Sequence, residues 1–182
     1  MIESALRETP HADRFLLQHR WKLGSDQLLE FFRLYRPDIV HFSGHGTEDN
    51  LILQDSKGNP WPLEREVARE AFRAAGRTTR RVVLNACHSR DVAEYVSEVI
   101  DCVIGMSRPV YDGTAASFAA TLYRVLGEGR SVRECFDEAR AQLTLSGLAG
   151  DRTPQILTRL GLDPRQIRPL QDWVGALMRG AN

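Results

Sequence analysis

The sequence predicts an α/β domain, specifically a three-layer α/β/α sandwich around a mainly parallel sheet. Two short apolar runs rich in β-branched residues, 38–43 and 81–86, end abruptly in small and polar residues. Strands that are buried on both faces of a parallel sheet have this pattern. Helical patterns come before and after both runs, which indicates alternating strands and helices. A length of 182 residues suits one domain with a substantial core.

The amino-terminal part predicts two helices and one strand before the first of these runs. Residues 2–8 have helical composition and precede Pro10. Residues 15–23 place apolar and aromatic side chains on one side at period two, which predicts a strand. Ser25 is the expected N-cap of a helix that Pro37 ends.

The stretch between the two buried runs predicts a hairpin and a helix. Apolar triplets at 51–53 and 61–63 bracket the turn-forming residues 55–59. The helix that follows ends at Gly76, and we expect its inward face to consist of Val67, Ala68, Ala71, Phe72 and Ala75.

The carboxyl-terminal part continues the alternation. The expected elements are a helix over 91–100, a strand over 102–106, a helix over 112–126, a helix over 131–147 that starts with a capping box, and a strand over 155–160. We assign residues 1–161 to one domain and 162–182 to an amphipathic helical extension. The apolar stripe of that extension is Leu170, Trp173, Val174 and Leu177.

Composition excludes several classes of function. The 24 basic and 24 acidic residues cancel, so bulk charge does not favour a nucleic acid or an anionic membrane as partner. No apolar run is long enough to span a bilayer, and the first residues are too charged for a signal peptide, which predicts a cytoplasmic protein. The three cysteines have no spacing typical of disulfides or zinc, and we expect no cofactor and no metal.

A histidine follows the first buried run and a cysteine follows the second. The carboxyl ends of neighbouring parallel strands meet at one edge of a sheet, so we expect His45 and Cys87 to emerge together. A thiolate beside an imidazole is an activated nucleophile. The backbone N–H groups of Gly46 and Cys87 are candidates for an oxyanion hole.

Four segments in a fixed order resemble the CHAT family of caspase-like cysteine peptidases, relatives of caspases and separases in clan CD. The segments are HFSGHG at 41–46, VLNACHS at 83–89, VIGMSR at 103–108 and LGEGRSV at 126–132. The resemblance implies a caspase-like fold with His45 as catalytic histidine and Cys87 as nucleophile, 42 residues apart (87 minus 45). It also implies an endopeptidase that cleaves a specific protein partner, in a setting of bacterial antiphage defence or programmed cell death.

The resemblance also implies residues of a substrate pocket, and it shows one departure from the family. By comparison with separase-like peptidases, Asp112 is expected to be the acidic residue of the pocket, which implies cleavage after Arg or Lys. Ser107 and Arg108 border the same loop and are expected to contact the substrate. The family's first strand, which lies beside the strand leading to His45, is lacking here. A shortened start, a misplaced start or a strand supplied by a regulatory protein partner would each explain this.

Other interpretations stay open for these residues. Cys87 alone is compatible with a buried strand cysteine, His45 with a polar loop cap and Asp112 with a plain helix N-cap. His41 is expected to be a core histidine, and His88 to point away from the thiol of its neighbour. Two further functional hypotheses are a non-catalytic CHAT-like interaction module with an incomplete pocket and a metal site formed by His41, His45, Cys87 and His88.

Overall fold

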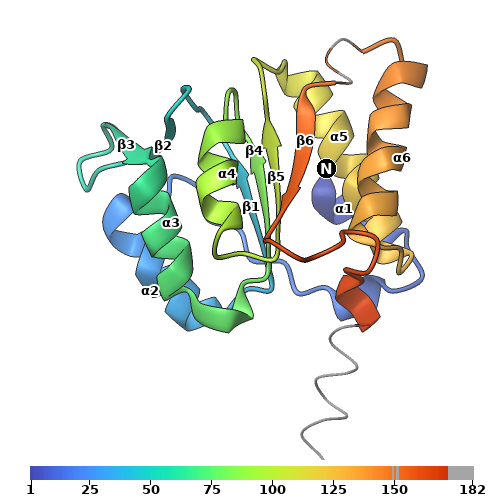
Figure 1. Cartoon of the computed structure of the whole chain (residues 1–182), viewed down its shortest axis with the longest axis horizontal. Helices are drawn as coiled ribbons and strands as arrows, with labels where there is room; N and C mark the ends of the chain where they lie inside the picture. The colour runs from blue at the N-terminus through green and yellow to red at the C-terminus, as the bar shows by residue number, and fades with distance from the viewer. Residues whose placement is uncertain (149, 151, 172–182) are drawn as a thin grey trace, which may run out of the picture. The chain divides into compact units, whose positions relative to one another are not determined.

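The computed structural model describes residues 1–148, 150 and 152–171, except for the side chain of Arg77. The chain forms two compact units (Figure 1). The first, which we call the helical unit, comprises residues 1–17, 111–151 and 163–182. The second, which we call the sheet unit, comprises residues 18–110 and 152–162.

The sheet unit contains a four-stranded, mostly parallel sheet in the order β1-β4-β5-β6. Its parallel strands are β1 (Ile39–Ser43), β4 (Arg81–Asn85) and β5 (Cys102–Met106), and β6 (Pro154–Thr158) runs antiparallel to β5. The predicted α/β class with a mainly parallel sheet is therefore confirmed. Every residue of β4 and β5 is buried, whereas the edge strand β1 is only half-buried. The continuous apolar runs of the two central strands follow from this burial.

Three helices of the sheet unit bury their apolar stripes against alternate residues of the sheet. They are α2 (Leu28–Tyr35), α3 (Arg65–Ala74) and α4 (Arg90–Ser97), and Figure 1 shows them on one side of the strands. Their shared core includes Phe32, Phe72 and Val96 from the helices with Leu84 and Val103 from the strands. The period of two in the strands and of about 3.6 in the helices makes these residues meet.

A hairpin follows β1 in the sheet unit, as predicted. Strand β2 (Asn50–Gln54) pairs antiparallel with β3 (Pro60–Glu64). The Asp55 carboxylate holds the turn by accepting the backbone N–H groups of Lys57 and Asn59 at 2.8 Å each. These hydrogen bonds, with the one from the Asn59 side chain as the largest contribution, lower the pKa of Asp55. The turn is therefore fixed by its own sequence rather than by packing.

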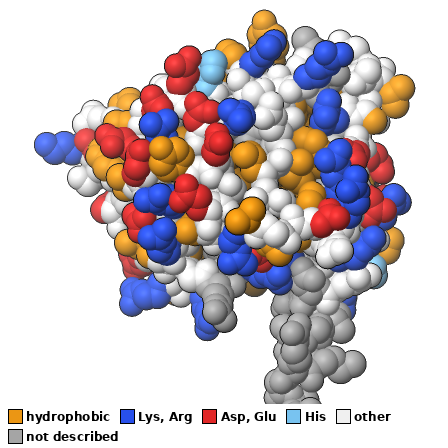
Figure 2. All heavy atoms as spheres, in the orientation of Figure 1, with side chains coloured by type: hydrophobic (Ala, Val, Ile, Leu, Met, Phe, Trp, Pro, Cys, Tyr) orange, Lys and Arg blue, Asp and Glu red, His pale blue; other side chains and the backbone are white. Residues whose placement is uncertain are grey.

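Ion pairs gather at the amino ends of the strands in the sheet unit. Arg81 Nη1 lies 2.6 Å from Asp38 Oδ2. Asp101 accepts Arg80 Nε at 2.8 Å and Arg159 Nη2 at 2.7 Å, through its two carboxylate oxygens. Acidic and basic side chains are also interspersed on the surface in Figure 2. The amino ends of the strands are thus occupied by structural ion pairs, and the candidate catalytic residues lie at the carboxyl ends.

The helical unit contains α1 (Ile2–Arg7), α5 (Asp112–Gly127) and α6 (Val132–Leu145). Thr9 packs so closely on Gly127 that any side chain at this glycine would clash with it. The predicted capping box is confirmed, because Ser131 Oγ accepts the Glu134 N–H while the Glu134 carboxylate accepts the Ser131 N–H. The hydroxyl and N–H of Ser131 lower the pKa of Glu134 to about 2.

Several predicted details are wrong. Residues 15–23 form no strand, since the segment spans the two units, Trp21 is 88% exposed and Lys22 has a left-handed φ of 58°. Gly24, not Ser25, caps the start of the second helix, which opens with a 3₁₀ turn (η2, Ser25–Gln27). Short 3₁₀ turns also occur at η1 (Ala12–Arg14) and η3 (Gly76–Thr78).

Two further differences concern helix faces. Val67, expected inside, is 45% exposed, because α3 buries Ala68 and Phe72 instead. Asp112 is the first residue of α5 and Tyr111 is the N-cap, so the N-cap interpretation of Asp112 is wrong. Trp173, Val174 and Leu177 of the predicted carboxyl-terminal stripe lie outside the described residues.

Candidate active site

His45 and Cys87 follow neighbouring strands at equivalent positions. Strands β1 and β4 are paired in parallel, and Ser43 is the register partner of Asn85. His45 and Cys87 each lie two residues beyond this pair. Neighbouring strands in a sheet are about 4.8 Å apart. Both residues therefore follow the carboxyl ends of neighbouring strands of the same sheet.

Gly46 joins the two segments. A Cβ atom at this position would clash with the carbonyl oxygen of Cys87, and it would lie 3.3 Å from the Ala86 Cβ. The segment after β1 can therefore approach the turn after β4 only because residue 46 is glycine. This contact brings the residue next to His45 directly against the backbone of the candidate nucleophile.

The hairpin positions the N–H of Gly46. Gly46 is bridged antiparallel to Leu51, with hydrogen bonds from Thr47 N to Asn50 O (2.9 Å) and from Ile52 N to His45 O (3.0 Å) on either side. This pattern makes Gly46 and Leu51 a non-hydrogen-bonded pair, whose N–H groups point away from each other. The Gly46 N–H is thus directed away from β2, as a role in an oxyanion hole requires.

Cys87 differs from the other two cysteines. Its side chain is partly exposed, whereas Cys102 and Cys135 are buried. Desolvation, the largest cause, raises the pKa of Cys102 and of Cys135 to about 12, so both stay protonated thiols at neutral pH. His45 is exposed. Of the three thiols, only Cys87 is accessible to an electrophile.

The thiol of Cys87 contacts the backbone of Val110. The Val110 N–H donates to Sγ at 3.5 Å, and Sγ lies 3.8 Å from the Val110 carbonyl oxygen, to which it donates. The contact holds the sulfur against the backbone of the chain that follows β5. This contact could not be predicted from the sequence, because a backbone N–H carries no residue-specific pattern.

The predicted substrate-contacting residues have different surroundings. The N–H and hydroxyl of Ser107 both donate to the Thr153 carbonyl oxygen, at 2.9 Å and 3.1 Å, so they are engaged within the protein. Arg108 is exposed. Asp112 is exposed at the start of α5 and belongs to the helical unit, so its role in a substrate pocket stays a prediction.

His41 and His88 lie on either side of the candidate site in sequence. Desolvation lowers the pKa of His41 to about 4, so its imidazole is neutral at physiological pH, and its side chain is half-buried in β1. His88 adopts a left-handed backbone conformation with φ of 55°, which forms the sharp turn after Cys87.

The His41 imidazole predicts an acid-sensitive fold. Its pKa is about 4 in the folded protein and 6.5 in the unfolded chain, so the unfolded state binds the proton more tightly between these values. Stability is expected to fall as pH decreases from 6.5 to 4, by up to about 3 kcal/mol from this group. Urea denaturation at pH 7, 5.5 and 4.5 measures this loss. In His41→Gln, a slope as steep as that of the wild type would assign the effect to other groups.

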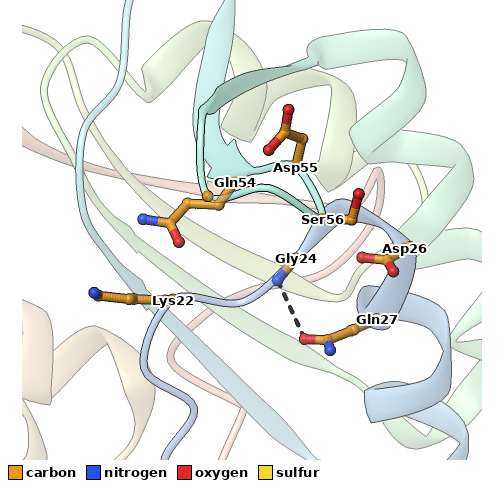
Figure 3. Close-up of a pocket in the computed structure, with 8 residues that line it drawn as sticks. Lys22, Gly24, Asp26, Gln27, Gln54, Asp55 and Ser56 are labelled. Atoms are coloured by element: carbon orange, nitrogen blue, oxygen red, sulfur yellow. Dashed lines mark hydrogen bonds between the residues drawn. The ribbon is translucent and has the colours of Figure 1, made fainter.

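The metal-site hypothesis and a surface pocket were also considered as functional sites. Within the described ranges, no group of three or more histidine, cysteine or acidic side chains is arranged to hold a metal ion, so the metal hypothesis gains no support. A pocket of about 300 Å³ lies between the 22–27 segment and the β2–β3 turn (Figure 3). Its lining is polar and contains none of the candidate catalytic residues.

The comparisons with known proteins give one finding. The family model described as CHAT domain matches residues 5–180. No curated protein matches the chain. In the part of the chain that the structure describes, no helix has the length and apolar character needed to cross a membrane.

Proposed function

Because the chain belongs to the CHAT domain family, a family related to cysteine peptidases, we propose that it is a cysteine endopeptidase with Cys87 as nucleophile and His45 as general base. The proposed architecture is a caspase-like three-layer sandwich. The observation that carries the proposal is the contact of Gly46 with the Cys87 carbonyl, which holds the histidine segment against the cysteine turn. The exposure of His45 and the partial exposure of Cys87 support it further.

The proposed reaction proceeds through an acyl-enzyme. His45 takes the proton of the Cys87 thiol, and the thiolate attacks the scissile carbonyl carbon. The N–H groups of Gly46 and Cys87 stabilise the negative charge that develops on the carbonyl oxygen. His45 then gives its proton to the leaving amine as the C–N bond breaks, which leaves a thioester. Water, deprotonated by His45, hydrolyses the thioester and restores the thiol.

The proposed substrate is a specific protein with a basic residue before the scissile bond. Asp112 is proposed to bind the Lys or Arg side chain, and Ser107 and Arg108 to contact the substrate backbone. Since the N–H and hydroxyl of Ser107 bond to Thr153, its carbonyl oxygen is the group offered to substrate. The exposure of Arg108 and Asp112 is compatible with these roles.

The biological setting is also a proposal. We propose a cytoplasmic peptidase in bacterial antiphage defence or programmed cell death. A regulatory protein partner is proposed to add a strand beside β1, which in the described residues pairs on one side only, with β4. Edge strands present unpaired N–H and C=O groups that suit such an addition.

The test uses peptidyl acyloxymethyl ketones that end in Arg, Lys, Asp or Leu. We expect a covalent adduct on Cys87, located by peptide mapping, which forms fastest with the Arg and Lys probes. Asp112→Asn is expected to lower the rate with basic probes only, while Asp137→Asn, an exposed acid of the same unit, leaves all rates unchanged. If no probe modifies Cys87 in protein that iodoacetamide still alkylates there, the endopeptidase proposal is wrong.

One observation favours a second candidate function, a non-catalytic interaction module. The backbone N–H and C=O groups of Val110 both contact the Cys87 thiol, which a substrate carbonyl has to approach. A module of this kind binds its partner without forming a covalent adduct. The probe experiment therefore distinguishes the two functions.

A further inference from the structure

The hydrogen-bond ladder between β4 and β5 ends before the strands do. The parallel register runs from Arg81–Cys102 to Val83–Ile104 and no further. Strand β5 continues to Met106, where it pairs on its other side with Pro154 of β6. The last residues of β4 and β5 therefore lie beyond their shared ladder, and those of β4 directly precede the Cys87 turn.

The side chain of Ser89 bridges this gap. Its hydroxyl donates to the Leu84 carbonyl oxygen at 2.7 Å and accepts the Met106 N–H at 3.0 Å. Ser89 is 0% exposed, so no water competes for these backbone groups. One hydroxyl thus takes the place of a rung between the two strands.

This use of Ser89 differs from what its position in the chain predicts. Ser89 is the N-cap of α4, where a serine side chain ordinarily accepts a backbone N–H of the first helical turn. Its side chain makes no capping hydrogen bond. The hydroxyl is committed to the two strands instead, and α4 begins without that stabilisation.

The bridge fixes both ends of the turn that carries the thiol. The turn starts at the end of β4 and closes at Ser89, whose N–H donates to the Ala86 carbonyl oxygen at 3.4 Å. The start of α4 also sits tightly on β5, because a Cβ at Gly105 would lie 2.7 Å from the Ala93 Cβ and 3.0 Å from the Ser89 carbonyl oxygen. Cys87 is therefore held at a set distance from the end of β5.

The chain beyond β5 returns to the same thiol. Four residues after Met106, the Val110 N–H donates to Cys87 Sγ at 3.5 Å. Between them, Ser107 is tied to the Thr153 carbonyl oxygen. The spacing that Ser89 sets between the cysteine turn and β5 thus also sets the geometry of the N–H···S contact.

We propose that Ser89 is a positioning residue for Cys87, which holds the thiol at the Val110 N–H by bridging Leu84 and Met106. The expected effect on catalysis rests on the proposed function, whereas the effect on the position of the thiol does not. Without the hydroxyl, the Leu84 C=O and Met106 N–H are buried without a partner, so the ends of the two strands are expected to separate and to carry the thiol away from Val110.

The test measures the pH profile of Cys87 alkylation by iodoacetamide, which requires no peptidase activity. The raised pKa values of Cys102 and Cys135 leave Cys87 as the reporting thiol, and Cys87→Ala gives the blank. We expect Ser89→Ala to alter the profile, because the thiol then loses its contact with the Val110 N–H. In peptide hydrolysis, kcat is expected to fall roughly tenfold or more, with a smaller change in KM.

Three controls separate positioning from folding. Ser97→Ala removes a hydroxyl that donates to the Glu94 carbonyl oxygen of its own helix, and is expected to leave the profile unchanged. Val96→Ala lowers stability through a buried residue of α4 and is also expected to leave it unchanged. Ser89→Gly removes the same hydroxyl with a residue that N-caps accept, so it replaces Ser89→Ala if that variant fails to fold.

The outcomes separate this inference from the proposed function. An unchanged alkylation profile in Ser89→Ala or Ser89→Gly, with a loss of stability like that of Val96→Ala, overturns the positioning role. A wild type that alkylates normally but hydrolyses no peptide overturns the peptidase proposal and leaves the alkylation result for Ser89 standing.

Discussion

Cys87→Ala is expected to abolish peptide hydrolysis, and His45→Ala to lower kcat/KM by about 10³-fold. The reasons differ. Without the thiol, no acyl-enzyme forms, and residual activity comes only from binding and electrostatic stabilisation, so we expect a loss of at least ~10⁴-fold. Without His45 the nucleophile remains, but the general base and acid are lost, which typically costs about 10²–10⁴-fold. Steady-state hydrolysis of a peptide with a basic residue before the scissile bond measures both.

The control for these two variants is the histidine next to the nucleophile. His88→Asn removes the imidazole while retaining a residue that tolerates the left-handed φ of 55° at this position. It is expected to change kcat/KM less than tenfold if His45 is the base. A loss in His88→Asn as large as that in His45→Ala would assign the base to His88 instead. In the double variant Cys87→Ala with His45→Ala, we expect no loss beyond that of Cys87→Ala, because the two residues act as one unit.

Most of the secondary structure could be predicted because the apolar pattern agrees with the burial. The runs 81–86 and 102–106 are fully buried in β4 and β5, and a continuous β-branched run has few other stable environments. The capping box at Ser131 and Glu134 could also be predicted, since its two hydrogen bonds lie within four residues. The prediction for 15–23 failed because alternation alone does not supply a partner strand. That segment crosses from one compact unit to the other instead.

In the candidate site, too, the residues marked by a local sequence pattern could be predicted, and those defined by long-range contacts could not. His45 and Cys87 could be proposed because each directly follows a recognisable strand, and parallel strands end at one edge. Ser89 and Val110 could not. Ser89 looks like a helix N-cap, and only the structure reveals that its hydroxyl bonds to Leu84 and Met106. The Val110 N–H contacts a thiol 23 residues away, and no local pattern encodes that contact.

Gly46→Ala is expected to lower kcat/KM by about 10²-fold without unfolding the protein. The added Cβ would clash with the Cys87 carbonyl oxygen and would lie 3.4 Å from the Asn50 carbonyl oxygen, so it meets backbone on two sides. Backbone cannot rotate away as a side chain can, and relief requires the histidine segment and the cysteine turn to move apart. A displacement of roughly 1 Å between catalytic groups is enough for a loss of this size. The same movement shifts the Gly46 N–H from its proposed place in the oxyanion hole.

The matched control lies two residues earlier in the same loop. The atoms nearest to a Cβ at Gly44 would all belong to the ring of Phe42, at 3.0 Å and 3.3 Å for the first two, and a ring can tilt where a carbonyl group cannot. Gly44→Ala is therefore expected to retain kcat/KM within about tenfold, since the contact between the two catalytic segments is preserved. The test is to measure kcat/KM of both variants and to compare their stability by urea denaturation. Wild-type kcat/KM in Gly46→Ala would contradict the role of this contact, because a clash between the two segments would then have no effect on the residues they carry.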